Sequence, residues 1–186
     1  AADAEEMLRF WREWKVPEFD LFGPMPFSAA ATISNDPVDP LPGGTTTTWL
    51  KALDRDIIDI IVDQAFPAGG PPPVLMTEVR HVGGAVSRGG SDAAYGNRDA
   101  TLLFEAVSAI PTLEARDAVQ AHFARVHERL RPHATGGAYL NFLEGAEKVA
   151  RTRAGFTPEA YRRLQALKGQ YDPQNRFRYG IDLMGG

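Results

Sequence analysis

Three short runs of valine, leucine, isoleucine and phenylalanine constrain the fold of this chain more than any other feature. They cover residues 74–80, 84–88 and 100–110 and are separated by turn-forming residues. Runs of this length and composition are typical of β-strands. We therefore predict three strands, and we expect them to pair antiparallel because the chain does not follow a strict βαβ alternation.

Apolar residues at helical spacing predict helices before and after these strands in the sequence. Each predicted helix has one apolar stripe that would face a core and one polar side left to water. The predicted helices cover residues 2–14, 49–66, 112–130, 147–153 and 158–171. Together with the strands they predict an α+β fold, in which an antiparallel sheet is covered by helices on one face.

The tract at residues 35–48 is rich in proline and ends in two glycines and four threonines. Proline and glycine break regular structure, so we predict an irregular tract whose threonines cap the helix that follows. The chain has no internal repeat and no long linker. We therefore expect residues 1–186 to form a single unit.

The composition of the chain argues against several classes of function. Of its 186 residues, 44% are hydrophobic, which is typical of a soluble globular protein. The 24 acidic and 20 basic residues are mixed along the chain, so we expect no nucleic-acid partner. No apolar run approaches the about 20 residues that span a bilayer, so we expect no membrane partner. The compartment stays unknown, and would be the cytoplasm if the source is bacterial.

The residue types give no support to metal or thiol chemistry. The chain has no cysteine, which excludes disulfides, a cysteine nucleophile and thiolate zinc sites. Among the histidines only His122 and His127 are close in sequence, and a spacing of five is poor for one helix face. We therefore predict no metal site.

Tyr139 and Asn141, two residues apart near the C-terminal end, are the first candidates for a functional site. We expect a strand here, and side chains at this spacing point to the same side of a strand. Both groups would then face one site. The predicted last helix stops at Asp172, because the proline that follows disfavours helical geometry in the residue before it.

Several motifs, in this order, resemble those of one protein family. They are residues 81–88 (HVGGAVSR), the loop at 92–99, residues 139–142 (YLNF) and residues 163–177 (RLQALKGQYDPQNRF). Residues 23–27 (GPMPF) and 49–53 (WLKAL) fit the same pattern. In register, these motifs resemble the C-terminal half of the berberine bridge enzyme-like FAD-linked oxidases, within the vanillyl-alcohol oxidase superfamily.

The resemblance implies roles for four residues. Tyr139 would lie by the flavin ring and help to take the proton of a substrate hydroxyl while hydride leaves for the flavin. Asn141 would orient the tyrosine, the substrate or the flavin edge, so both are candidate cofactor-binding residues. An unperturbed phenol has a pKa of about 10, so such a base needs a nearby positive charge or an ionised partner. Arg98 and Glu78 are candidate substrate-binding residues, although for Arg98 we favour a salt bridge that anchors its loop.

Three positions depart from the family pattern. Phe142 replaces the last tyrosine of the strand motif, and Asn97 replaces the histidine that commonly precedes the arginine. The tail at residues 178–183 lacks the asparagine-rich run of the relatives. Contacts that relatives make through these groups are therefore not expected here.

The resemblance further implies that the chain is a fragment. Residues 1–135 would form part of a substrate-binding domain, and residues 136–186 the berberine-bridge-like segment. An N-terminal FAD-binding domain would be the missing partner, so this chain alone would be inactive and bind no FAD. The complete protein would oxidise a small-molecule substrate, an alcohol, sugar or related hydroxyl compound, by hydride transfer to flavin. The alternative is a non-catalytic fragment or a stand-alone binding domain without bound flavin.

Overall fold

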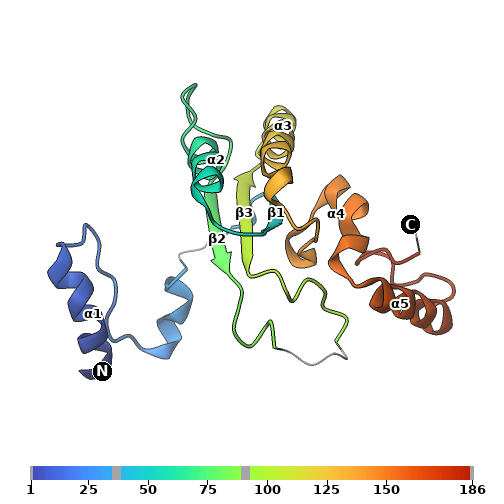
Figure 1. Cartoon of the computed structure of the whole chain (residues 1–186), viewed down its shortest axis with the longest axis horizontal. Helices are drawn as coiled ribbons and strands as arrows, with labels where there is room; N and C mark the ends of the chain where they lie inside the picture. The colour runs from blue at the N-terminus through green and yellow to red at the C-terminus, as the bar shows by residue number, and fades with distance from the viewer. Residues whose placement is uncertain (1, 35–38, 89–92, 185–186) are drawn as a thin grey trace. The chain divides into compact units, whose positions relative to one another are not determined.

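A computed structural model describes residues 2–34, 39–88 and 93–184 and divides the chain into two compact units. The first unit is Ala1–Pro40 and the second is Leu41–Gly186 (Figure 1). The sequence predicted a single unit, whereas the contacts of the structure separate at residue 40. The expected boundary between residues 135 and 136 remains a prediction.

The first unit is built on the amphipathic helix α1 (Ala2–Trp14), which has the predicted bounds, and a short 3-10 helix, η1 (Phe27–Thr32). The side chain of Arg12 links the helix to the segment that follows it. Its guanidinium pairs with Glu5 at 2.6 Å and donates to the carbonyl oxygen of Phe22 at 3.0 Å. None of the described residues of this unit is buried, so its aromatic side chains are left exposed.

The second unit contains a sheet of three antiparallel strands in the order β1-β3-β2 (Figure 1). The strands are β1 (Gly43–Leu50), β2 (Met76–His81) and β3 (Leu102–Ala109). The central strand β3 pairs with β1 on one side and with β2 on the other. This confirms the predicted α+β class and two of the three predicted strands.

Two sequence predictions in this sheet are wrong. Residues 43–50 form β1, where we expected an irregular tract and the start of a helix. Threonine is β-branched and fits a pleated sheet, and pairing along the whole length of β3 outweighs the local turn signals. Residues 84–88, expected as a strand, form turns that begin at Gly84 with φ +63°. Glycine adopts this backbone conformation readily, so the chain turns here instead of extending.

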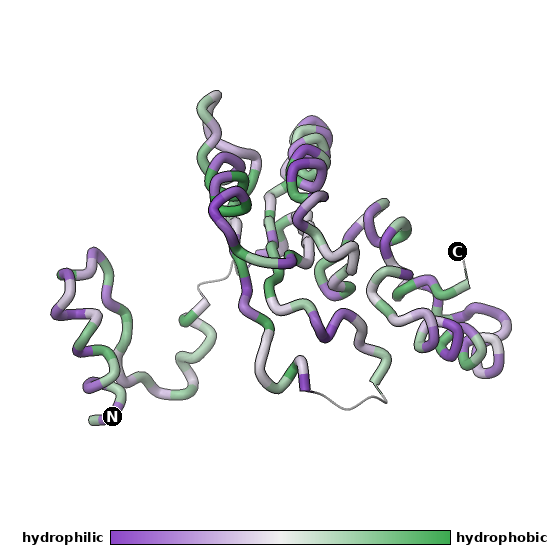
Figure 2. The backbone as a smooth tube through the Cα atoms, viewed as in Figure 1, coloured by the Kyte–Doolittle hydropathy of each residue, from purple (hydrophilic) through white to green (hydrophobic). Residues whose placement is uncertain are grey.

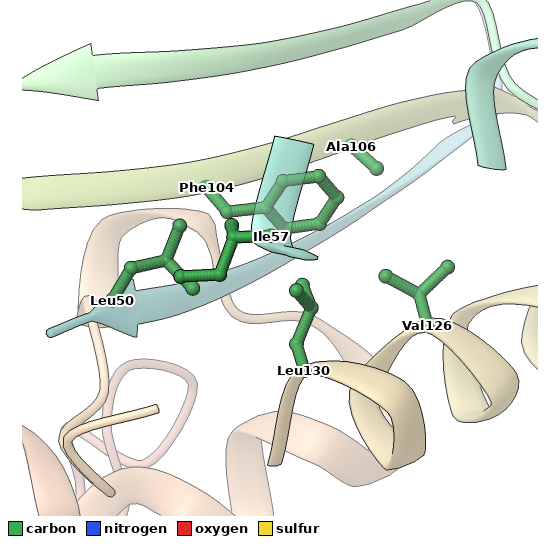
Figure 3. Close-up of a cluster of buried hydrophobic side chains, with 6 residues drawn as sticks. All are labelled: Leu50, Ile57, Phe104, Ala106, Val126 and Leu130. Atoms are coloured by element: carbon green, nitrogen blue, oxygen red, sulfur yellow. The ribbon is translucent and has the colours of Figure 1, made fainter. Parts of the chain in front are cut away.

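Two helices cover one face of the sheet, as predicted. They are α2 (Arg55–Ala65) and α3 (Leu113–Leu130), and both carry hydrophilic as well as hydrophobic residues (Figure 2). Each begins at a capping side chain, because Asp54 accepts from the amide of Ile57 at 3.0 Å and Thr112 from that of Ala115 at 3.1 Å. The core between helices and sheet is the cluster of Leu50, Ile57, Phe104, Ala106, Val126 and Leu130 (Figure 3).

The rest of the chain consists of short helices that follow α3. They are η2 (Arg131–His133), η3 (Leu140–Phe142), α4 (Gly145–Arg151), η4 (Thr152–Gly155) and α5 (Pro158–Tyr171). The bounds of α5 are those predicted. None of the helices in the described ranges is long and apolar enough to span a membrane.

Side chains from α4 and the residue before it satisfy the outer edge of β1. The guanidinium of Arg151 donates to the carbonyl oxygen of Thr47 at 2.9 Å and to that of Gly137 at 3.0 Å. The carboxylate of Glu144 accepts from the amide of Thr45 at 3.2 Å. These bonds replace a neighbouring strand and hold the C-terminal segment against the sheet.

Candidate functional site

The candidate site lies on the second face of the sheet, the face away from α2 and α3. Strand alternation places Thr47 and Trp49 of β1, Glu105 of β3, and Glu78 and Arg80 of β2 on this face. Since Trp49 packs with Tyr139, the segment around η3 also lies against it. The second face therefore brings together residues that are far apart in the sequence.

Three polar side chains form a row straight across this face. Thr47 lies opposite Glu105 in the pairing of β1 with β3, and Glu78 lies opposite Glu105 in the pairing of β2 with β3. One buried side-chain oxygen of each makes no hydrogen bond among the described residues, although those of Glu78 and Glu105 form ion pairs with Arg80. Nε1 of Trp49 also lacks a hydrogen bond there. Buried polar groups without a hydrogen bond are rare in folded proteins, and a functional role is one explanation for them.

Arg80 is the cation of this row. It forms ion pairs with Glu78 and, from Nη2 to Oε2 at 3.1 Å, with Glu105. Its guanidinium also lies 5.1 Å from the ring centre of Phe142, at the end of η3. Burial raises the pKa of Glu105 above its ordinary value, against the opposing effect of Arg80, and the neighbouring Glu78 adds to the increase. Glu105 is therefore protonated more easily than an exposed glutamate.

The raised pKa of Glu105 predicts that the stability of the chain depends on pH. Because the folded-state pKa of Glu105 is raised, its stabilising contribution is present below the unfolded-state pKa and is lost as pH rises through the folded-state pKa. We expect Glu105→Gln to remove this dependence and to be more stable than the parent chain above that range. The measurement is the urea midpoint at a series of pH values. Glu128→Gln, on an exposed part of α3, serves as control, and an unchanged profile in Glu105→Gln would contradict the prediction.

Tyr139 and Asn141 lie beside this row, but not in the predicted strand. Tyr139 has extended backbone angles, and residues 140–142 form the 3-10 helix η3, so the expected strand is wrong. The pair still converges, since Nδ2 of Asn141 donates to the hydroxyl of Tyr139 at 3.4 Å. The half-buried Tyr139 ring stands edge-on to Trp49, with centres 5.8 Å apart, and lies 5.3 Å from that of Phe142. The turn of η3 therefore brings the side chains of Tyr139 and Asn141 together, which we expected from strand alternation.

Arg98 contacts its own loop. Its guanidinium donates to the carbonyl oxygen of Val86 at 2.7 Å and lies 5.0 Å from the ring centre of Tyr95. Burial raises the pKa of Tyr95, and charge on Tyr139 adds to the increase while Arg98 opposes it, so this second phenol belongs to the same neighbourhood. In the described ranges no hydrogen bond or ion pair joins Arg98 to Glu78. Asp92, the first residue of the family motif, lies outside the described residues.

Asn97 fastens this loop to the C-terminal segment. Its amide donates to the carbonyl oxygens of Ala138 at 3.3 Å and Ala154 at 3.0 Å, from a backbone with φ +58°. Asparagine tolerates this conformation better than most residues do. At the position where the family resemblance implies a histidine, this chain therefore has an asparagine whose hydrogen bonds hold the loop to the C-terminal segment.

Sequence reasoning missed Glu105, Arg80 and Tyr95. A glutamate in the middle of an apolar run was the available signal for Glu105, because a charge is rarely placed there without a partner. The described residues hold no group of three or more histidines and carboxylates placed to bind a metal ion.

One protein-family model matches part of this chain. Residues 138–180, which include Tyr139 and Asn141, match the family model described as berberine and berberine-like. No curated protein matches the sequence of the chain.

Solved structures with a similar fold include a BBE-like protein and an oxidoreductase. BBE-like 1 from Physcomitrella patens is similar, as wild type with TM-score 0.62 and 17% identity over 82% of this chain, and as a variant with TM-score 0.64 and 18% identity. GilR, an oxidoreductase that catalyses the terminal step of gilvocarcin biosynthesis, was solved with pregilvocarcin and matches with TM-score 0.57 and 19% identity over 72% of this chain.

The chain spans about a third of the length of these structures, 33% of BBE-like 1 and 30% of GilR. At such identities the likeness establishes a shared fold. The family model covers the segment that carries the site, and the residues it matches include two of the motifs on which the resemblance rests. Residues 138–180 therefore match the berberine and berberine-like family, which confirms the resemblance of this chain to berberine bridge enzyme-like FAD-linked oxidases.

Proposed function

We propose that this chain is the substrate-binding part of an FAD-dependent oxidoreductase that oxidises an alcohol, sugar or related hydroxyl compound. The observation that carries the proposal is the second face of the sheet, where Tyr139 and Asn141 lie beside buried polar atoms of Thr47 and Trp49 that make no hydrogen bond among the described residues. A substrate with several hydroxyl groups supplies both donors and acceptors for such atoms. The family match of residues 138–180 supports the same reading.

The residues of this face fit a flavin. A flavin has flat apolar faces and polar atoms along its edges, and the site offers aromatic rings beside an amide. We propose that Tyr139 and Asn141 contact FAD, and that a separate FAD-binding domain, the partner of this chain, holds most of it. When bound, FAD supplies the acceptor for two electrons.

Tyr139 is the proposed catalytic residue. In its deprotonated form Tyr139 would accept the proton of the substrate hydroxyl and become a neutral phenol, and the amide of Asn141, 3.4 Å away, would hold the oxygen in place. Glu78, half-buried and paired with Arg80, is the proposed acceptor for a second substrate hydroxyl. For Arg98 we propose that it holds its loop, and Tyr95 with it, against the bound substrate.

The test uses the longer protein in which this chain adjoins its FAD-binding domain. We expect the purified protein to show the absorption of oxidised flavin. Adding a hydroxyl compound in the absence of oxygen should bleach this absorption, because the substrate reduces the flavin. In Glu78→Gln the substrate concentration for half-maximal bleaching should rise about tenfold, the size of a lost hydrogen bond to a charged group. Glu128→Gln should behave as the parent does. A longer protein without flavin would overturn the proposal and favour a binding domain without catalysis.

A further inference from the structure

A pocket lies apart from the second face of the sheet. It has a volume of about 490 Å³, and its walls come from α2, the connection after α2, and α3. The connection contributes residues 67–73, a stretch of prolines, glycines and one alanine with no charged side chain. None of the residues of the candidate site lines this pocket. Any ligand here would therefore bind independently of the proposed catalysis.

Two buried polar side chains line the pocket without bonding partners. His122 of α3 is 4% exposed and Gln64 of α2 is 9% exposed. Neither side chain makes a hydrogen bond to the described residues of the chain. Their polar atoms are not among the fully buried ones that lack a hydrogen bond, and both side chains line the pocket. They are therefore available to bond a ligand in it.

The charged groups around the pocket favour an anion. Arg125 and Arg129 follow His122 by three and seven residues, which places all three on one face of α3. Arg129 is paired with Asp63 of α2 at 3.0 Å, whereas Arg125 has no ion pair among the described residues. The amide of Gln64 adds further N–H donors. One acidic group, already paired, therefore faces two guanidinium groups, an imidazole and an amide.

We propose that this pocket binds a small organic molecule through an oxyanion group, a carboxylate or a phosphate. Arg125 would hold the oxyanion, since a guanidinium matches both groups with two parallel hydrogen bonds. His122 and Gln64 would donate to its remaining oxygens. The pocket is larger than an inorganic anion needs, and the proline side chains of residues 71–73 give the body of the ligand an apolar wall.

Binding should be linked to protonation of His122. Burial lowers the pKa of this imidazole, and the charge of Arg125 lowers it further. The other charged groups facing it are Arg129 of α3 and Asp63 of α2, which pair with each other. An oxyanion beside the imidazole would stabilise its charged form, so binding raises the pKa of His122 and takes up a proton.

The experiment follows the ring signals of His122 by NMR in this chain during titration with phenyl phosphate and, separately, benzoate. Sodium chloride keeps the ionic strength constant. We expect saturable changes in the chemical shifts of the His122 ring and a raised pKa of His122 with at least one probe. The probe that binds more tightly identifies the oxyanion. Arg125→Gln should weaken that binding about tenfold or more. Arg116→Gln, the same change elsewhere on α3, should bind as the parent does.

Two results would overturn the proposal. One is a response to both probes no larger than that to chloride, and the other is equal binding by Arg125→Gln and Arg116→Gln. His122→Phe separates binding from folding, since it removes a buried polar group without a partner. We expect its urea midpoint to equal or exceed that of the parent chain while the probes no longer raise the midpoint.

Discussion

Replacing Tyr139 by phenylalanine in the complete enzyme should slow flavin reduction by substrate about 10²- to 10⁴-fold, the contribution of a positioned acid or base. The change removes only the hydroxyl that accepts from Asn141 at 3.4 Å. The ring contacts with Trp49 and Phe142, at 5.8 and 5.3 Å between centres, are those a phenylalanine also makes. The fold and the shape of the site should therefore persist. Stopped-flow mixing without oxygen measures this step directly.

Tyr171→Phe is the matched control for this experiment. Tyr171 closes α5 and is 78% exposed, so loss of its hydroxyl should leave flavin reduction unchanged. If Tyr139→Phe reduces its flavin as fast as Tyr171→Phe does, Tyr139 is not the base. Asn141→Ala should give a smaller decrease, because water can replace one amide donor at an exposed position.

Replacing Phe104 by alanine should lower the free energy of unfolding by about 3–5 kcal/mol, the usual cost of removing a buried aromatic ring. Phe104 of the central strand β3 is 1% exposed and packs with Ile57 of α2 and Leu130 of α3 (Figure 3). No neighbour can fill the space without moving a helix. Domains are stable by only about 5–15 kcal/mol, so this loss is a large part of the total. Urea unfolding followed by circular dichroism gives the value.

Phe177→Ala is the control for this core substitution. Phe177 is 84% exposed, so its removal should change stability by no more than about 0.5 kcal/mol. A similar loss in both variants would mean that unfolding does not depend on the core between the sheet and its two helices.

The candidate site could be predicted only in part. Tyr139 and Asn141 were recognised because their motif is short and continuous, and the structure brings them together. Their predicted strand was wrong, because residues 140–142 form the 3-10 helix η3 after Tyr139 packs against Trp49. The row of Thr47, Glu105 and Glu78 was missed, since only the register of three paired strands aligns them.

The sequence by itself determined three of the helices of this protein. The bounds of α1 and α5 were predicted and those of α3 to within one residue, because helical periodicity and capping residues are local signals. Only the tertiary structure decided that the glycines and threonines of residues 43–50 form a strand, since the partner strand lies at residues 102–109. Strand pairing is a long-range interaction, so neither β1 nor the polar row that it completes on the second face is visible in a local pattern.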